Sequence, residues 1–534
     1  MPPPYAILSH TWRKNEISFQ DMTSCADVQS KPEYDKIRNS SRKALHQKLD
    51  FIWIDSCCID KSSSAELSEA INSMFRWYKD AVVCFAYLED LPIGQSTATK
   101  PELERCRWFT RGWTLQELIA PKEVRFYDRG WNCRGTKETL QDSISSITAI
   151  KTHVLLGKHL NRLGSIPVAE RMSWASRRET TRQEDMAYCL LGIFGVNMAL
   201  IYGEGANAFT RLQEEIIKRT NDLSIFAWDS RGRSSGPYCG LLAESPAEFS
   251  RVSPSLFTDT RFFTTEFTVT NRGLRMTTEL WVPPNLASFN RDRLGYFLCL
   301  SHSPSSSNTF IGIHLKKVGQ SSFVRISDKP LTADYLQSTE PDREESFRLQ
   351  TIYIATSYST ETSLDTMMKS PPCHFPAHAA FRVSGVAPRA GWDVFDRLLH
   401  AGGAGFSSFF GVICFEVSDT GNETEASIKL GLLINLLGGA GPECSLFKWQ
   451  GTAQQQMGVA FEQGSEAVLP QTVMRAMLAM SHGTNVDYHF GSGHFRVSAS
   501  MRREIVKEIS AEPLHTVHLQ RLKSANGEDW VALD

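Results

Sequence analysis

The sequence has 534 residues, of which 41% are hydrophobic, and a formal net charge of −2. A chain of this length is too long for one hydrophobic core, so we expect two or three domains. The near-zero charge argues against nucleic-acid binding, and no run reaches the roughly 18 consecutive apolar residues of a membrane span. The N-terminus has no basic region followed by an apolar run, so we expect no secretory signal and a cytoplasmic location.

The twelve cysteines lie mostly in apolar runs, as at Cys84, Cys189, Cys299 and Cys414. This placement is typical of buried thiols rather than of a disulfide framework. Because no Cys-x-x-Cys pair occurs, the sequence predicts no metal site.

Four short apolar runs with helical patterns between them predict an α/β domain with a parallel sheet and right-handed crossovers. The expected strands are Tyr5–His10, Phe51–Asp55, Ala81–Leu88 and Val124–Asp128. The second is apolar until its final acid, as in parallel strands covered on both faces. A capping box, Ser63-x-x-Glu66, starts a helix that continues to Asp80.

The carboxyl ends of parallel strands form ligand crevices, and here these ends carry Ser9, His10 and Asp55. Trp12 follows the first strand directly. We therefore expect these side chains near one edge of the sheet.

The segment Trp108–Pro121 contains two tryptophans, one arginine and one glutamate, Glu117. Good helix formers follow Trp113, and Pro121 ends the helix near Ala120 because its ring disfavours helical geometry in the preceding residue. This short helix is expected to form the crossover between the third and fourth strands.

Residues 140–228 read as helical, with apolar stripes along Arg182–Phe194 and Ala206–Thr220. Between these two helices, Gly203-Glu-Gly205-Ala superficially resembles a dinucleotide-binding fingerprint. The fingerprint requires a preceding strand, so a turn between helices is the better interpretation.

A segment rich in Gly, Ser and Arg at 231–237 indicates a linker. Short strand-like runs then predict a mainly β, antiparallel, sandwich-like domain over 238–534. The expected strands are Phe262–Thr270, Gly273–Val282, Gly295–Ser301, Thr309–Lys317, Ser322–Ile326, Gln350–Ala355, Ala380–Ser384, Phe409–Val417, Ser427–Leu433 and Phe495–Ala499. The predicted organisation is an α/β domain at 1–139, a helical extension at 140–230, the linker and the β domain.

Four ordered blocks resemble the fungal heterokaryon-incompatibility (HET) domain family: Tyr5–Trp12, Phe51–Lys61, Arg107–Pro121 and Arg182–Trp228. The resemblance implies a cell-death effector in fungal non-self recognition. The sheet domain of that family is similar to Toll/interleukin receptor (TIR) domains, which implies a flavodoxin-like sheet. Many HET proteins have a further segment ahead of the first strand, so we expect an upstream start or a missing edge element.

Plant TIR domains carry Trp-Cys-Leu-x-Glu-Leu, in which the glutamate serves NAD cleavage, and Trp113-Thr-Leu-Gln-Glu117-Leu118 resembles it with Thr114 in place of the cysteine. This chain departs from the family at Arg13, where many HET proteins have glycine. It departs again at Arg111, where TIR enzymes commonly have serine.

The resemblance implies NAD as a substrate and no resident cofactor. It implies that Glu117 contacts the ribose and stabilises positive charge on it, and that Trp113 or Trp12 stacks on the cationic ring. Ser9 and Asp55 would supply hydrogen bonds, and Arg111 an anion contact.

Each role has a structural alternative. Glu117 could be a salt-bridged surface carboxylate, Trp113 a core anchor, Asp55 a turn cap and Arg111 a surface ion pair, while His10 could orient a neighbour or simply fill space.

Two functional hypotheses follow: an NAD glycohydrolase activated by self-association, or a non-enzymatic module that signals death by assembly. Both predict a homo-oligomer in the active state and an unknown protein trigger. A decayed or truncated family member is a third hypothesis.

Overall fold

The computed structural model describes residues 2–533. The exceptions are 14, 25–26, 158–159, 232–235, 237, 253–265, 282–294, 303–308, 319–320, 328–330, 335–346, 359–371, 379, 388–391, 394–396, 401–409, 418–427, 436–442, 450–482, 491–492, 506–512 and 525–530. Most of the predicted linker at 231–237 therefore lies outside the described residues.

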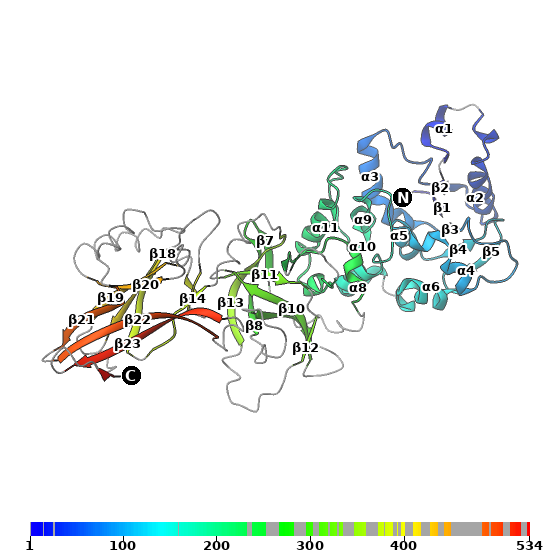
Figure 1. Ribbon diagram of the computed structural model, residues 1–534. Helices are drawn as coiled ribbons and strands as arrows, with labels where there is room; N and C mark the ends of the chain where they lie inside the picture. Colours follow the sequence, from blue (N-terminus) through cyan, green and yellow to red (C-terminus); the bar gives the residue numbers. More distant parts are fainter. Residues whose placement is uncertain are drawn as a thin grey trace.

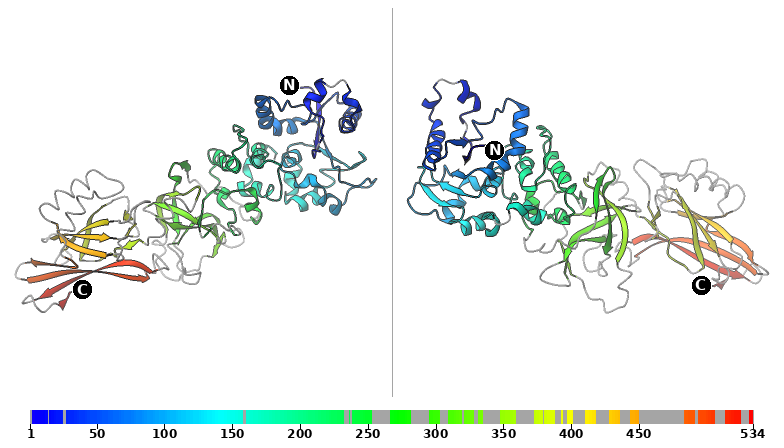
Figure 2. Two further views of the ribbon diagram at one scale, coloured as in Figure 1. Left: turned by 45° about the horizontal axis from the view of Figure 1, so that its top comes forward. Right: turned by 180° about the vertical axis from the view of Figure 1, so that it is seen from behind.

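The protein is elongated. Figure 1 shows the α/β part at one end, a β-rich part in the middle and a second β-rich part that ends at the C-terminus. The two views in Figure 2 show the same row of three parts.

The N-terminal sheet has five strands in the order β2-β1-β3-β4-β5. The strands are β1 (Tyr5–His10), β2 (Phe51–Trp53), β3 (Val83–Tyr87), β4 (Val124–Tyr127) and β5 (Cys133–Thr136). The first four pair in parallel, as predicted, and β5 adds an antiparallel edge that the sequence did not reveal. In this order the connections leave β1 and β3 in opposite directions, so the carboxyl ends of these two strands form the switch point where ligands bind in such sheets.

Helices cover both faces of this sheet. They are α1 (Phe19–Ser24), η1 (Val28–Ser30), α2 (Tyr34–His46), α3 (Ser64–Asp80), α4 (Lys100–Glu104), η2 (Arg107–Thr110) and α5 (Thr114–Ile119). Alternate β1 side chains enter two cores, because Ala6 and Leu8 pack in a cluster with Ile37 of α2 while Ile7 packs in a cluster with Leu115 of α5. The helix α5 crosses between β3 and β4, as expected.

Two sequence predictions for this region were wrong in detail. Phe51–Asp55 is not covered on both faces: β2 stops at Trp53, lies at the sheet edge and leaves Phe51 55% exposed. The capping box is only half formed. The Ser63 hydroxyl accepts from the Glu66 N–H at 3.3 Å, but the Glu66 carboxylate accepts from the Asp60 N–H at 2.9 Å.

Residues 140–228 are helical, as predicted. The elements are α6 (Gln141–Thr148), α7 (Thr152–Leu155), η3 (Leu160–Ser165), α8 (Val168–Ser173), α9 (Asp185–Tyr188), α10 (Leu191–Phe194), α11 (Asn207–Ile217) and η4 (Leu223–Phe226). The helix expected over Arg182–Phe194 is instead divided into α9 and α10. The two glycines of the fingerprint-like loop have positive φ, and their N–H groups donate to the Glu184 carboxylate at 2.7 and 3.1 Å. This loop turns between helices and binds an anion of the protein itself.

The C-terminal half is mainly β, as predicted, with β6–β24 in three sheets. The eight-stranded sheet comprises β6 (Tyr238–Cys239), β7 (Phe267–Thr270), β8 (Gly273–Trp281), β9 (Gly295–His302), β10 (Thr309–Lys317), β11 (Ser322–Ile326), β12 (Thr332–Asp334) and β13 (Phe347–Ile354), with η5 (Pro246–Phe249) between β6 and β7. The seven-stranded sheet comprises β14 (Cys373–His374), β16 (Trp392–Asp393), β17 (Leu398–Leu399), β21 (Asn485–Phe490), β22 (Gly493–Ile505), β23 (Pro513–Ser524) and β24 (Val531–Ala532). The four-stranded sheet comprises β15 (Phe381–Ala387), β18 (Phe410–Val417), β19 (Ile428–Asn435) and β20 (Glu443–Lys448).

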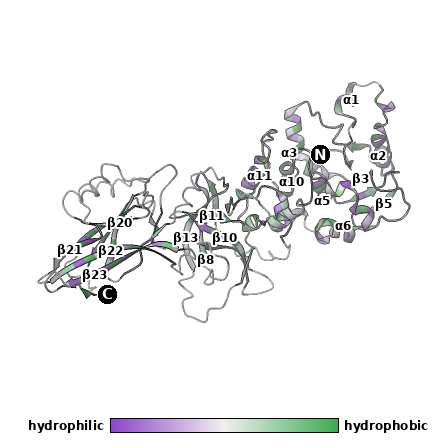
Figure 3. Cartoon of the chain, in the orientation of Figure 1, coloured by the Kyte–Doolittle hydropathy of each residue, from purple (hydrophilic) through white to green (hydrophobic). Residues whose placement is uncertain are grey.

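The last two sheets share one core, so this part is a sandwich. Val497 of β22 and Phe415 of β18 belong to the same buried cluster. Buried and partly buried residues alternate along Phe495–Ser500, as expected for a strand with one face in the core of a sandwich. Figure 3 shows both hydrophobic and hydrophilic residues along β22 and β23. Not every pairing is antiparallel, because β11–β13 and β14–β23 are parallel.

Two buried cations connect the three parts. Arg325 of β11 stacks on Trp228, with its guanidinium 3.6 Å from the ring centroid, and donates to the Phe226 carbonyl at 2.9 Å. Lys317 of β10 forms a fully buried ion pair with Asp393 of β16. The eight-stranded sheet is thus tied to the helical region on one side and to the sandwich on the other.

Candidate functional site

A buried polar cluster lies where β1 ends, on the face of the sheet that α5 covers. The Ser9 hydroxyl donates to the Glu117 carboxylate and accepts from the Trp108 indole N–H at 2.7 Å. Ser9 and Trp108 are fully buried, and Glu117 is 6% exposed. Tyr78 of α3 closes the cluster, with its hydroxyl donating to the Leu8 carbonyl at 3.1 Å. These residues are called the Ser9–Glu117 cluster below.

Burial dominates the electrostatics of Glu117. It raises the pKa of this carboxyl to about 8, and the negative charge of Asp55 adds to the increase. The hydrogen bond from Ser9 and the positive charge of Arg178 act against it. At neutral pH the carboxyl is therefore mostly protonated, and a nearby positive charge would favour its ionised form.

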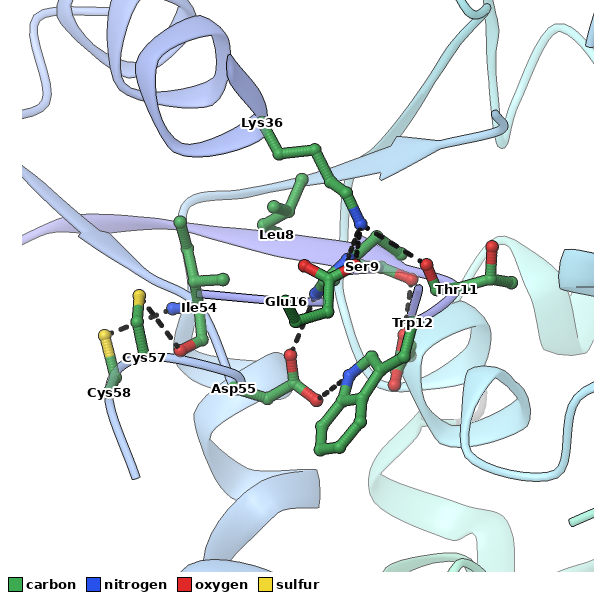
Figure 4. A network of polar contacts seen from close by, with 12 residues as sticks. Leu8, Ser9, Thr11, Trp12, Glu16, Lys36, Ile54, Asp55, Cys57 and Cys58 are labelled. Carbon is green, nitrogen blue, oxygen red and sulfur yellow. Dashed lines mark hydrogen bonds and ion pairs between the residues drawn. The ribbon is translucent and has the colours of Figure 1, made fainter. Parts of the chain in front are cut away.

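A second polar cluster surrounds Asp55 beyond the end of β2. The Trp12 indole donates to Asp55 Oδ2 at 2.8 Å, and His10 Nε2 lies 3.0 Å from Asp55 Oδ1. Lys36 Nζ lies 2.9 Å from His10 Nδ1 and also pairs with Glu16. Figure 4 shows Asp55 beside Trp12, and Lys36 reaching down from α2. These residues are called the His10–Asp55 cluster.

The hydrogen bonds of the His10–Asp55 cluster fix its charges. A lysine ammonium can only donate, so His10 Nδ1 is the acceptor and its Nε2–H donates to Asp55. Burial alone would raise the pKa of Asp55, but the His10 and Trp12 hydrogen bonds and the charge of Lys61 hold the pKa below its ordinary value. Asp55 is therefore an anion here, and it is not a turn cap.

The two clusters meet at the end of β1 but lie on opposite faces of the strand. Ser9 follows Ile7 by two residues and shares its face, whereas His10 shares the face of Leu8. Asp55 still contributes to the raised pKa of Glu117, so the clusters interact electrostatically. The side chains expected near one edge of the sheet thus form two adjoining groups.

Trp12 is the exposed member of the site. It is 47% exposed, and the Lys61 ammonium lies 3.5 Å from its ring centroid. A ring face that holds an ammonium ion at this distance is suited to a flat cation as well.

Arg111 and Trp113 make their contacts elsewhere. The Arg111 guanidinium donates to the Thr181 hydroxyl at 3.2 Å, and its backbone bridges to Glu179. Burial raises the pKa of the partly buried Asp185, and the contacts of its carboxyl with Tyr202 and Trp113 act against that increase. Both side chains thus contact the 179–185 segment, and their expected substrate contacts remain predictions.

Sequence reasoning missed Arg178, which holds the N-terminal end of α5. Its Nη1 donates to the Arg111 carbonyl at 2.8 Å and to the Thr114 hydroxyl at 2.9 Å. No local signal marks it, because it lies 64 residues after Thr114. The sequence analysis included Trp108 in the Trp108–Pro121 segment but assigned it no role. Only the fold shows that its indole is buried and donates to Ser9.

Cys58 follows the His10–Asp55 cluster. The Ile54 N–H donates to its sulfur at 3.4 Å, and both sulfurs lie beside Ile54 in Figure 4. A hydrogen bond from Cys57 is the main cause that lowers the pKa of Cys58 to about 7, while burial acts against it. The thiol is free and exposed.

No three side chains of His, Cys, Asp or Glu gather to hold a metal ion among the described residues. In the same part of the chain, no helix combines the length and apolar character needed to cross a bilayer.

Comparisons with known proteins place these clusters in a family context. A family model described as Heterokaryon incompatibility protein (HET) matches residues 5–92, and one described as a domain of unknown function (DUF8212) matches residues 207–284. The first match includes Ser9, His10, Trp12 and Asp55 and ends before Glu117. The vegetative incompatibility protein HET-E-1 of Podospora anserina is 48% identical over 224 residues, which are 40% of this chain and 16% of that protein. The match thus spans less than a fifth of that relative. No solved structure matches the chain.

Proposed function

This chain contains a heterokaryon incompatibility (HET) domain, and from that premise we propose that it is a cell-death effector of fungal non-self recognition whose HET domain acts as a TIR-like NAD glycohydrolase. The observation that carries the proposal is the Glu117 carboxyl, buried at the switch point of the sheet against Ser9. The strand order β2-β1-β3-β4 also agrees with the flavodoxin-like arrangement of TIR domains.

The proposed reaction breaks the bond between ribose C1′ and the nicotinamide nitrogen. The bonding electrons leave with the nicotinamide, which becomes neutral, and positive charge develops on the ribose. An ionised Glu117 stabilises that charge, and water then adds at C1′ and releases a proton. Nicotinamide is a good leaving group, so no second carboxylate has to protonate it.

The raised pKa of Glu117 fits this chemistry. A carboxyl desolvated before the reaction has no hydration shell to lose, and a cationic substrate shifts its pKa back towards the ordinary range. Trp12, rather than Trp113, is the proposed stacking platform, since its exposed ring already holds the Lys61 ammonium. Ser9 orients Glu117, and His10 orients Asp55.

Access to Glu117 requires movement, because this side chain is only 6% exposed. Self-association is the proposed trigger of that movement. Within the described residues β2 is the outermost strand of its sheet and carries the exposed Phe51, and such an edge suits pairing with a second copy. The β-rich region at 238–534 would sense the protein trigger or hold the enzyme inactive.

The test is NAD consumption by the purified full chain, alone and after forced clustering through an appended dimerisation tag. Clustered wild type should release nicotinamide. Glu117→Gln should abolish turnover, and Glu69→Gln, an exposed glutamate on α3, should not. Absence of turnover by clustered, folded wild type would favour the other candidate.

That candidate is a non-enzymatic module that triggers death by assembly. The closed, protonated state of Glu117 favours it, because such a group serves packing as well as catalysis. In that case cell death should persist in Glu117→Gln and be lost when assembly is blocked.

A further inference from the structure

A separate pocket lies between the helical region and the start of the β-rich region. It has a volume of about 280 Å³ and is lined by Phe109, the end of α6, Ser173, Trp174, residues 176–178 and residues 250–252. This volume approaches the roughly 300 Å³ at which small-ligand pockets begin. None of the proposed chemistry at Glu117 uses it.

The pocket is strongly positive. Three arginines line it, Arg177, Arg178 and Arg251, and within the described part of the chain no acidic side chain does. Asp229 reaches Arg251 at 3.4 Å but does not line the pocket. The end of α6 contributes at most about half a negative charge, which three full positive charges outweigh.

Two buried donors of this pocket have no hydrogen-bond partner among the described residues. They are the Trp174 indole Nε1 and Arg178 Nη2, and both residues are at least nine-tenths buried. Buried donors are nearly always paired in folded proteins. Two unpaired donors on side chains that line the pocket therefore indicate that acceptor oxygens from a ligand belong here.

The remaining lining suggests the rest of the ligand. Four serine and threonine residues line the pocket, and the hydroxyls of Thr148, Ser173 and Ser176 donate to backbone carbonyls, so they can act towards a ligand only as acceptors. Phe109 and Trp174 also line it and are 5% and 2% exposed. Arginines that present planar donor groups suit phosphate oxygens, and aromatic side chains suit a flat ring.

We infer that this pocket binds a small molecule that carries a phosphate group and a flat ring, such as a nucleotide. The inference does not depend on NAD cleavage at Glu117. It does link the pocket to α5, because Arg178 both lines the pocket and holds Thr114. A bound anion pairs with Arg178 and makes the N-terminal end of α5 more rigid.

The test is isothermal titration calorimetry of the full chain with two probes. Adenosine monophosphate carries a phosphate and a ring, and inorganic pyrophosphate carries no ring. Both should bind at one saturable site, adenosine monophosphate more tightly. The double variant Arg177→Gln/Arg251→Gln should weaken both at least tenfold. These two side chains are exposed, so the fold is spared. The matched control is Arg38→Gln/Arg76→Gln, which removes two exposed arginines elsewhere and should bind as wild type does.

Absence of saturable binding to wild type, or equal affinity in the pocket variant and the control, would overturn the inference. Hydrogen exchange tests the link to α5: adenosine monophosphate should slow exchange across residues 108–120 in wild type and not in the pocket variant. Binding without that protection would refute the link between the pocket and α5.

Discussion

Replacing Glu117 with glutamine should stabilise the folded protein at alkaline pH. The neutral amide keeps the shape of the side chain and still accepts a hydrogen bond from Ser9. The wild-type carboxyl has its pKa raised from 4.5 to about 8 by burial. Between these values the folded protein holds a proton that the unfolded chain has released, so the free energy of unfolding falls as pH rises.

The size of the effect follows from the shift. Each pKa unit corresponds to about 1.4 kcal/mol, so the full shift corresponds to about 5 kcal/mol above pH 8 and roughly 3 kcal/mol at pH 7. Glutamine does not titrate, and the variant escapes this loss. Near pH 4.5 both proteins carry a neutral group and should be nearly equal in stability.

The assay is urea unfolding of wild type, Glu117→Gln and Glu69→Gln at pH 5 and pH 9. Tryptophan fluorescence suits it, because eight of the twelve tryptophans lie before residue 229. The Glu117→Gln midpoint should exceed that of wild type by a large margin at pH 9 and only slightly at pH 5, while Glu69→Gln follows wild type throughout. Parallel pH profiles for all three proteins would refute a buried, neutral Glu117.

Three further outcomes are expected. Ser9→Ala removes two buried hydrogen bonds and should lower the free energy of unfolding by about 1–3 kcal/mol, measured by urea unfolding at pH 6. Gly192→Ala places a methyl group against Phe75 and should cost about 1–3 kcal/mol, while Gly164→Ala, which faces open space, should cost little in the same assay. Cys58, with a pKa of about 7, should be alkylated by iodoacetamide at half its maximal rate near that pH, read by peptide mass spectrometry; a midpoint at the ordinary thiol pKa of about 8.5 would contradict the hydrogen bonds assigned to it.

Local sequence patterns predicted some elements that carry the site and not others. The apolar run before Ser9 and His10 predicted a strand that ends in polar groups, and β1 forms there. Pro121 predicted the end of the short helix, and α5 ends at Ile119. The strand before Asp55 was also found, but its place at the edge depends on sheet order, which no run of adjacent residues specifies.

The sequence by itself determined the four parallel strands of the N-terminal part and the helices α3 and α5, but not the edge strand β5, and it identified Ser9, Asp55 and Glu117 as residues at strand ends and on the crossover helix. Only the tertiary structure decided that Ser9 pairs with Glu117, 108 positions away, and that His10 faces the opposite side. The tertiary structure also placed Arg178 against Thr114 at the N-terminal end of α5 and buried Glu117, which raises the pKa of its carboxyl. The physical reason is that strand and helix formation depend on neighbours along the chain, whereas desolvation and partner choice depend on what packing brings into contact.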